Sequence, residues 1–379
     1  MAVVALEGWD NYAIPADMQL RVGALQWTMS YQFLGATAAT DTSTGLPALI
    51  TPGRGGFGKA MSIPLFLRKF DFIGGLNANF SVNYTTAFFG FAMQFQNCIN
   101  LAYFTVTLWD PVAAAAQCTI AFYDTGMIRV FSGLGIDGTL LATSVNNAFN
   151  PIISNFVEIH PVIGSSGSIA VQINGQQVFG TTGATGIRTQ ATANAWFGGL
   201  IFWAALGATE YINATGAIQI DDFRLNDTTT GPGLYPCNSW MGDLRVAQCL
   251  PMGNAAAGWT PLAGANWQEV SEAGFDGDAS YNSTTTAGAE DLFNLAGLAA
   301  TINEVIAVQL TGAYRQADAS PHGVSQQIKI GGTDHAQPTR ALGLSYQFVT
   351  DVLPINPTSG ASWTLTDVNT MQIGCTAQT

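Results

Sequence analysis

The chain is short of charge. Of its 379 residues, 12 are Lys or Arg and 25 are Asp or Glu. Its 10% of charged residues compares with about 25% in an ordinary soluble domain. A globular chain of this mass is expected to expose on the order of 14,000 Å², or about one charge per 400 Å². Either hydroxyl and amide groups cover this surface or neighbouring subunits bury much of it. Both alternatives favour an assembled structural protein over a free monomer.

Several other absences exclude function classes. No run of Lys or Arg is present, so the electrostatic footprint of a nucleic-acid-binding protein is missing. No stretch of 18 uninterrupted apolar residues occurs, so no membrane span is predicted. Residues 1–12 lack the basic and long apolar regions of a secretory signal peptide. We therefore predict neither a nucleic-acid partner nor a membrane.

Cysteine and histidine are too few and too scattered for a zinc site. The five cysteines include no Cys-x-x-Cys pair, and only three histidines are available. Isolated buried thiols that behave as small apolar groups are the expected arrangement. A disulfide between Cys237 and Cys249 is left open, and the odd number of cysteines leaves at least one thiol unpaired or intermolecular.

Short β-rich segments separated by glycine and proline make up most of the chain. Their aromatic and β-branched residues nearly alternate with others, which is typical of half-buried antiparallel strands. Residues 168–179 predict a hairpin, because Asn174 and Gly175 tolerate the positive φ angles of a type I′ turn. Short strands at this spacing predict a sandwich, jelly roll or barrel. Examples are residues 102–109, 118–123 and 127–131.

Few helices are expected. Residues 289–295 are interpreted as a short helical turn, and residues 366–372 as another with Thr366 or Asp367 as its N-cap.

The chain is predicted to contain two domains. The turn-rich stretch 226–238 follows a strand and precedes a new series of strand candidates. We place a larger domain at residues 1–228 and a smaller β-rich domain at residues 229–379. The strands expected in the second domain are residues 243–250, 304–314, 325–330 and 345–352.

Three segments of the first half follow one another in a recognisable order. Residues 156–163 read Phe-Val-Glu-Ile-His-Pro-Val-Ile, a hairpin follows at 168–178, and residues 218–225 read Ile-Gln-Ile-Asp-Asp-Phe-Arg-Leu. This order resembles the concanavalin A-like superfamily of laminin-G, lectin and glucanase jelly rolls. The resemblance implies an all-β fold, in which an antiparallel concanavalin A-like jelly-roll sandwich precedes a smaller C-terminal β domain.

Segments before and after the jelly roll extend the resemblance. Leu-Glu-Gly-Trp-Asp-Asn-Tyr at 6–12 and the glycine-rich residues 53–61 precede it, and residues 240–246, 276–281 and 290–293 follow it. This arrangement is similar to a group of tailed-bacteriophage virion proteins. The resemblance implies a virion structural protein on the particle exterior, namely a capsid decoration, neck or tail/fibre component.

The resemblance also implies where the protein is found and what it contacts. The virion would be assembled in the cytoplasm of the host bacterium. The expected partners are further copies of the chain, with trimers favoured, other virion proteins and host-surface glycans. Low charge agrees with this assignment, because subunits of a shell or tail bury surface in symmetric contacts.

A glycan hydrolase is the enzymatic alternative, since members of the superfamily cleave β-glucans. Retaining hydrolysis needs two carboxylates about 5 Å apart. Glu158 is alone on its strand, and the adjacent Asp221 and Asp222 are expected to point to opposite faces. We therefore predict that the chain is not an enzyme and that it has no catalytic residues.

The histidines do not complete a nucleophilic site. His160 shares a strand face with Glu158, and a Glu–His pair of this kind can orient an imidazole. No Gly-x-Ser-x-Gly motif accompanies it, so a hydrogen-bonded histidine within the sheet is the preferred interpretation. His322 and His335 lie in polar segments and are expected to be exposed in loops.

Three further candidates each have a structural interpretation. Asp276 and Asp278, like Asp221 and Asp222, offer the oxygen ligands that Ca²⁺ prefers, although Asp-Gly is also an ordinary turn. We predict no bound cofactor or metal, with Ca²⁺ as the exception to test. The aromatic run 196–203 suits either a sugar-stacking platform or a strand buried on both faces, and we favour the strand. Residues 53–58 are glycine-rich but do not match a phosphate-binding loop.

We therefore predict a structural virion component that acts through oligomeric assembly. The alternative is a lectin-like carbohydrate-binding or receptor-binding module of the same fold. A glycan hydrolase is the third candidate, and it is the one that the missing acid pair disfavours.

Overall fold

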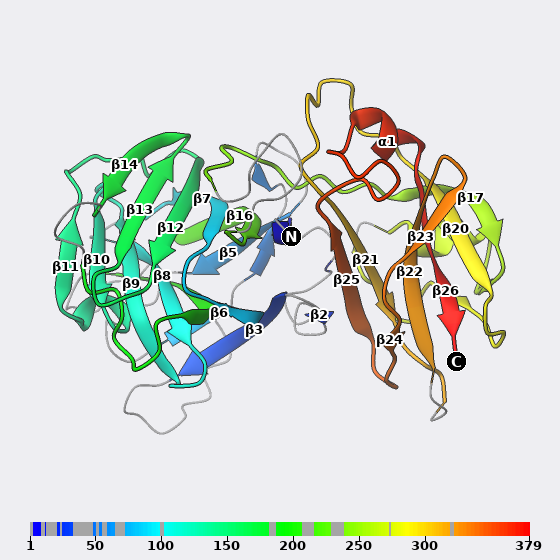
Figure 1. Ribbon diagram of the computed structural model, residues 1–379, viewed down its shortest axis with the longest axis horizontal. Helices are drawn as coiled ribbons and strands as arrows, with labels where there is room; N and C mark the ends of the chain where they lie inside the picture. The colour runs from blue at the N-terminus through cyan, green and yellow to red at the C-terminus, as the bar shows by residue number, and fades with distance from the viewer. Residues whose placement is uncertain are drawn as a thin grey trace.

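The chain is built almost entirely of antiparallel β-sheet (Figure 1). The computed structural model describes residues 3–8, 12, 21–22, 25–32, 48–50, 53–54, 59–64, 73–98, 102–181, 187–206, 216–228, 239–272, 274–318 and 322–379. The predicted all-β sandwich is confirmed by the strand order within these ranges. No helix among the described residues is long and apolar enough to cross a membrane.

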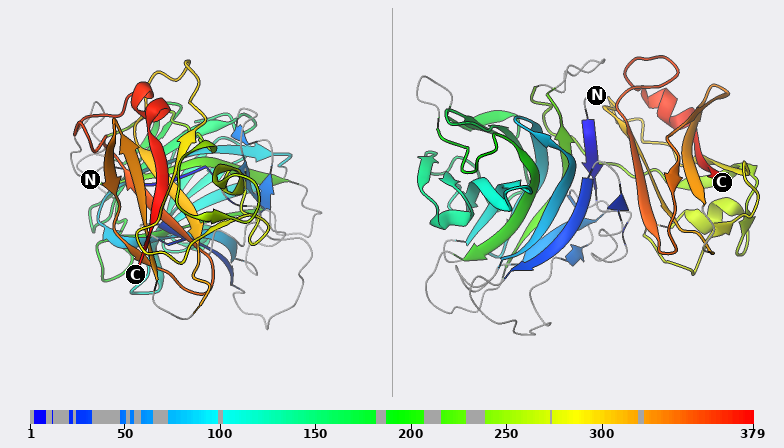
Figure 2. Two further views of the ribbon diagram at one scale, coloured as in Figure 1. Left: turned by 90° about the vertical axis from the view of Figure 1, so that its right-hand side faces the viewer. Right: turned by 60° about the horizontal axis from the view of Figure 1, so that its bottom comes forward.

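Two large sheets form the sandwich, and Figure 2 shows their curved faces opposite each other. Sheet 1 runs in the order β14 (Gln176–Gly180), β13 (Ser168–Ile173), β12 (Asn155–Val162), β7 (Phe88–Gln96), β16 (Ala217–Asn226), β5 (Ala60–Pro64) and β4 (Ala48–Ile50), with β1 (Val3–Glu7) paired to β16. Sheet 2 runs in the order β11 (Leu140–Thr143), β10 (Ile128–Ser132), β9 (Ala115–Tyr123), β8 (Ala102–Asp110), β15 (Phe197–Leu206), β6 (Ile73–Tyr84) and β3 (Leu25–Gln32).

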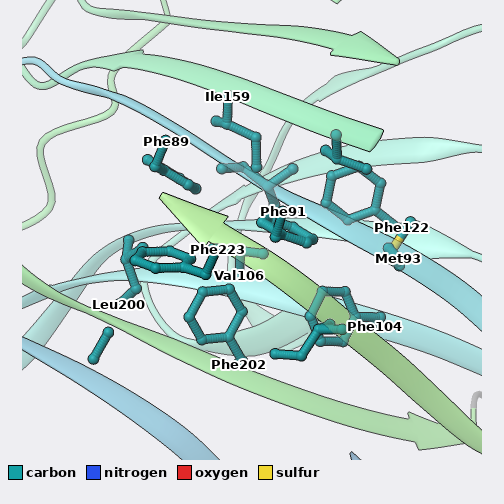
Figure 3. Packing of buried hydrophobic residues seen from close by; sticks show 14 of the residues in the cluster. Phe89, Phe91, Met93, Phe104, Val106, Phe122, Ile159, Leu200, Phe202 and Phe223 are labelled. Atoms are coloured by element: carbon teal, nitrogen blue, oxygen red, sulfur yellow. The ribbon is translucent and has the colours of Figure 1, made fainter. Parts of the chain in front are cut away.

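Phenylalanine side chains from both sheets fill the space between them (Figure 3). Phe91 of sheet 1 packs against Phe104 and Phe202 of sheet 2, with ring centroids 5.9 and 5.6 Å away. All three rings are fully buried. Each contributes about 1.5–3 kcal/mol through burial of its apolar area. The core therefore depends on aromatic contacts that bridge the two layers.

Strand β15 is buried on both of its faces, as predicted for the aromatic run 196–203. Leu200 and Phe202 point into the core, and Trp203 on the opposite face is only 4% exposed. The hairpin prediction is also confirmed, because Asn174 and Gly175 have φ angles of 51° and 78° between β13 and β14.

The C-terminal region contains smaller sheets (Figure 1). Sheet 3 runs in the order β17 (Pro251–Ala257), β20 (Glu290–Leu295), β26 (Gln372–Gln378), β22 (Gly323–Ile330) and β23 (Thr333–Ala336), with β24 (Arg340–Ala341) paired to β22. Sheet 4 consists of β2 (Arg21–Val22), β25 (Gln347–Leu353) and β21 (Val308–Tyr314), and β18 (Thr260–Pro261) pairs with β19 (Asn282–Ser283). Helix α1 (Leu365–Thr370) and the 3₁₀ turns η3 (Gly135–Asp137) and η4 (Asn266–Val270) complete the described elements.

Two of the expected elements of this region are wrong. Residues 289–295 form strand β20 instead of a helix, because β17 and β26 bond to its two edges. Residues 243–250 form no strand and run as an irregular connection. The strand candidates 304–314, 325–330 and 345–352 are confirmed in part or in full by β21, β22 and β25.

Helix α1 is present, but its N-cap is neither Thr366 nor Asp367. Thr364 holds that position, and its hydroxyl accepts a hydrogen bond from the Asp367 N–H at 3.1 Å. The Asp367 carboxylate accepts in return from the Thr364 N–H at 2.9 Å, which completes a capping box.

One strand pair joins the beginning of the chain to its last third. Arg21 and Val22 of β2 pair in parallel with Phe348 and Val349 of β25. Sheet 4 therefore contains residues from both sides of the predicted division between 228 and 229, which itself stays a prediction.

Candidate functional site

The predicted candidate Glu158 is part of a buried ion pair on the outer face of sheet 1. Arg224 donates to Glu158, and both side chains are 2% exposed. The N–H groups of Met241 and Gly242 also donate to the two carboxylate oxygens, at 2.8 and 3.0 Å. The connection 239–250 is thereby held against the sheet. This carboxylate has no free access to a sugar.

A glycine makes the ion pair possible. Gly90 of β7 lies between Glu158 of β12 and Arg224 of β16 in the strand register. A Cβ atom at Gly90 would lie 3.1 Å from the Arg224 Nε and 3.1 Å from the Phe156 ring. The arginine can therefore reach across β7 only because position 90 has no side chain, and its guanidinium also lies 5.3 Å from the Phe156 ring centre.

Asp221 and Asp222 do not point to opposite faces in the expected way. The register of β16 shifts between Asp221 and Arg224, and Asp222 has a φ of 52°. In this bulge both carboxylates reach Arg54, which donates its N–H to Asp221 at 2.8 Å and its guanidinium to Asp222 at 3.3 Å. The Val246 N–H donates to Asp222 at 2.8 Å. These proposed calcium ligands are therefore engaged by an arginine and backbone groups.

Burial has the largest effect on the pKa of Asp222. Loss of solvation raises its pKa, although the Val246 N–H and Arg54 act in the opposite direction. The two acids that hold the connection 239–250, Glu158 and Asp222, are each compensated by an arginine and by backbone N–H groups.

His160 lies beside the ion pair without joining it. Its ring stacks on Phe88 at a centroid distance of 4.0 Å, and Trp240 packs edge-on at 6.1 Å. The Nε2 atom lies 3.0 Å from the Thr86 hydroxyl. Burial lowers the pKa of His160, so the neutral ring is favoured. This environment agrees with a hydrogen-bonded histidine of the sheet.

The two other histidines also have local partners. His322 lies 3.2 Å from the Asp318 carboxylate. His335 is on strand β23 instead of a loop, and its Nε2 atom lies 2.7 Å from the Thr358 hydroxyl.

The outer face of sheet 2 contains a second aromatic cluster. Tyr103 and Trp203 meet edge to face at 5.5 Å, with Tyr123 and Phe131 beside them. The turn after β10 covers them in part, since a Cβ at Gly135 would lie 3.2 Å from the Trp203 ring. Within the described part of the chain, the Tyr103 hydroxyl and the Trp203 Nε1 have no hydrogen-bond partner. The cluster is buried and does not form an exposed platform.

A cavity of about 1500 Å³ lies where the C-terminal region meets the sandwich, and Leu6, Gly8, Asp222 and Arg224 of the sandwich form part of its wall. The C-terminal part of the wall comes from the connection 239–250 and from the segment that leads from η4 through β19 to β20. The predicted calcium candidates Asp276 and Asp278 line it. No group of three His, Cys, Asp or Glu residues that could hold a metal ion occurs among the described residues.

Two acids in this cavity share one hydroxyl group. Ser280 donates to Glu272, and its oxygen also lies 2.9 Å from the Asp276 carboxylate. A serine has a single hydroxyl proton, so it satisfies only one of the two carboxylates at a time. Burial raises the pKa of Glu272, with further contributions from the charges of Asp276 and Glu269. A carboxyl group with a raised pKa beside a second carboxyl group is the arrangement that general acid–base chemistry uses.

A second polar cluster lies in the same cavity. Arg315 and the Tyr346 hydroxyl both donate to Asp278, at 2.8 and 2.7 Å. The guanidinium of Arg315 lies 5.0 Å from the Tyr346 ring centre. Burial and the neighbouring Asp278 raise the pKa of Tyr346 to about 12, so its hydroxyl stays protonated. Tyr281, with 36% of its surface exposed, adds an accessible aromatic ring.

Sequence reasoning missed most of this cavity. Glu272, Ser280, Arg315 and Tyr346 match no motif and lie on separate elements. One signal was available, because four of the ten residues from 269 to 278 are acidic in a chain with 25 acids among 379 residues.

Among the described cysteines, Cys118 and Cys375 are buried and Cys98 and Cys249 are half-buried. Cys249 is free, and Cys237, with which a disulfide was left open, lies outside the described residues. Burial raises the pKa of Cys118 and of Cys375 to about 12, so both thiols stay protonated.

Comparison with known proteins gives structural neighbours only. No protein-family model and no curated protein matches the chain. A glucuronan lyase from the fungus Trichoderma reesei matches with a TM-score of 0.36 and 12% identity, over 53% of this chain and 96% of that one. A Bacillus licheniformis β-glucanase matches with a TM-score of 0.32 and 15% identity, over 53% and 98%. A β-1,3-1,4-glucanase from a mouse hindgut metagenome matches with a TM-score of 0.35 and 13% identity, over 59% and 98%.

These neighbours overturn the prediction that the chain is not an enzyme. They are lyases and glucanases, whereas the prediction considered only a pair of carboxylates on the strands of the sandwich. That test was too narrow, because a carboxylate pair also occurs outside the sandwich at Glu272 and Asp276. None of these three neighbours is a bacteriophage protein.

Proposed function

We propose that the protein binds a polysaccharide in the cavity of the C-terminal region. The supporting observation is that one cavity combines the Glu272–Asp276 pair, the Asp278–Arg315–Tyr346 cluster and the exposed ring of Tyr281. Aromatic rings stack on the apolar faces of sugars, and carboxylates and guanidinium groups bond to sugar hydroxyls.

The size and charge of the cavity narrow the class of polysaccharide that fits it. Pockets for drug-sized ligands measure about 300–1,000 Å³, so a cavity of about 1500 Å³ suits several sugar units. Glu269, Glu272, Asp276 and Asp278 outnumber the single arginine Arg315 in this part of the wall. Like charges repel, so a neutral glycan is favoured over a uronic-acid polymer.

Glycan cleavage is the second candidate, and the raised pKa of Glu272 favours it. Glu272 would act as the general acid and Asp276 as the second carboxyl group of the pair. Both carboxyl groups reach the same Ser280 oxygen, so they lie close together, as the two carboxyl groups of a retaining mechanism do.

A glycan array followed by calorimetry tests both parts of the proposal. Tyr281→Ala and Arg315→Met should each weaken binding of an array hit by about tenfold, which corresponds to about 1.4 kcal/mol. Glu272→Gln should keep binding within about threefold and abolish release of reducing sugar, because only the acid role requires its proton. Asp334→Asn, an exposed acid outside the cavity wall, is the matched control.

The outcomes separate binding from cleavage. Binding that is unchanged in Tyr281→Ala and Arg315→Met, or no array hit at all, contradicts the proposed site. Sugar release that persists in Glu272→Gln contradicts only the acid role.

A location on a phage particle is a separate part of the proposal. Two observations support it. The N-terminal and C-terminal segments resemble those of tailed-bacteriophage virion proteins, and the chain has only 12 basic and 25 acidic residues for an exposed surface of 16366 Å². Mass spectrometry of purified particles from the producing host should detect the chain in stoichiometric amounts. Its absence from particles would reject this location without affecting the glycan site.

A further inference from the structure

One end of the sandwich carries almost no charge. From residue 138 to residue 187 the sequence contains a single charged residue, Glu158, which is buried in its ion pair with Arg224. This stretch supplies β11, β12, β13 and β14, which include the outermost strand at one side of each sheet. Figure 1 places them at the end of the molecule farthest from sheet 3.

Apolar side chains are exposed at this charge-free end. Leu140, Val145, Ile152 and Ile153 are 50%, 74%, 71% and 48% exposed. All four belong to β11 or to the connection that follows it. Scattered exposed hydrophobics are normal, but a group on one short segment indicates a surface that another molecule covers.

The backbone of β11 is also open to pairing. Among the described strands only β10 bonds to it. The Ser144 N–H donates to the Ile128 carbonyl of β10 at 2.8 Å. Backbone groups alternate in direction along an antiparallel ladder, so those of Thr143 face away from β10. Strand β11 reads Leu-Leu-Ala-Thr and so lacks the Lys, Pro or inward charges that protect many edge strands. Its length of 4 residues and the register shift against β10 limit any further pairing to a short ladder around Thr143.

We propose that β11 pairs antiparallel with β11 of a second copy of the chain, which joins two sandwiches about a two-fold axis. A two-fold contact places the same surface on both sides, so the partner must be uncharged, apolar and extended at the same place. The segment 138–157 meets each of these requirements, and it has no ionised group that would oppose its own copy. The cavity of the C-terminal region stays open, since β11 lies at the opposite end of the molecule.

Sedimentation velocity of the full chain over a concentration series tests the contact. The chain should sediment at about twice its monomer mass of 39.9 kDa at micromolar concentration. Thr143→Lys and Thr143→Glu each place like charges across the two-fold axis. Each variant alone should raise the dissociation constant by about tenfold or more. An equimolar mixture of the two should restore dimers, because the charges are then opposite.

A matched control and the opposing outcomes complete the test. Val112, on the turn between β8 and β9, is 74% exposed like Val145, and Val112→Lys should leave the dimer intact. Circular dichroism of every variant should match the parent chain. Three results would overturn the proposal, namely a monomer at all concentrations, a trimer, or a mixture that fails to recover dimers.

Discussion

Two groups of acids in this protein have opposite environments. Glu158 and Asp222, on the outer face of sheet 1, are each bonded to an arginine and to backbone N–H groups of the connection 239–250. Glu272 and Asp276, in the cavity of the C-terminal region, share one serine hydroxyl. The first group is fully engaged within the protein, whereas the second retains bonding capacity for a ligand.

The difference shows how a carboxylate's partners separate structure from function. A buried charge is stable only if the surrounding groups compensate it, and such a charge holds elements together. A partly exposed acid with a raised pKa and few donors is instead a candidate for chemistry. Four predictions test this distinction.

The largest effect is expected at the ion pair. Glu158→Gln or Arg224→Met leaves one buried charge without its partner and should lower the free energy of unfolding by about 3–5 kcal/mol. Urea unfolding followed by tryptophan fluorescence measures this loss. A double variant with apolar residues at both positions should recover part of it. A loss below about 1 kcal/mol in the single variants would place the ion pair among weak surface contacts.

The next effect is expected at the glycine that the ion pair spans. Gly90→Ala brings a methyl group within 3.1 Å of Arg224, Phe156 and the Val157 carbonyl, and should cost about 1–3 kcal/mol of unfolding free energy. Gly253→Ala in β17 is the control, because its Cβ would meet only Asn294 at 3.7 Å. Equal stability of the two variants would show that Arg224 does not need the gap at position 90.

Asp110 extends the first group of acids to sheet 2. Burial would raise its pKa, but hydrogen bonds from Thr192, Asn194 and two backbone N–H groups outweigh it and lower the pKa. Its stabilisation is therefore present above the ordinary aspartate pKa and is lost as pH falls through the lowered value. Asp110→Asn should cost about 1–2 kcal/mol at neutral pH and less in acid. Unfolding measured at several pH values checks this, and a cost that grows in acid would contradict it.

The stability contribution of Glu272 should depend on pH in the opposite direction to that of Asp110, and its effect should be the smallest of the four. Its raised pKa means that the folded protein binds this proton more tightly, so stability falls as pH rises through the raised value. Glu272→Gln should match the parent chain in acid and exceed it by less than about 1 kcal/mol at neutral pH, because the group is only half-buried. Thermal unfolding at the two pH values measures the difference. A variant that is less stable at neutral pH would place Glu272 with the structural acids.

The fold was predictable where local sequence decides it. Asn174 and Gly175 specify their turn by backbone preference, and alternation specifies strands such as β8 and β22. Residues 289–295 were misassigned because Ala, Glu and Leu favour a helix in isolation, whereas bonding from β17 and β26 decides the strand. The N-cap was misplaced because Thr364, and neither Thr366 nor Asp367, is the N-cap residue, and it forms the capping box with Asp367.

The candidate sites were less predictable because they depend on tertiary register. Glu158 was noticed, but its partner Arg224 is 66 residues away and reaches it across Gly90. The bulge that turns Asp222 toward Arg54 has no signature in the sequence. The four acids at 269–278 were the one signal of the cavity in the sequence, and only the structure shows that Ser280 joins Glu272 and Asp276.

The parallel pairing of β2 with β25 has a consequence for how the chain reaches its native state. Sheet 4 cannot be completed during synthesis until residues near position 348 have emerged, long after Arg21 and Val22. Such long-range closure is entropically costly and slows folding. The N-terminal segment must stay available while the sandwich forms, so chaperone dependence and sensitivity to N-terminal truncation should concentrate on this last step.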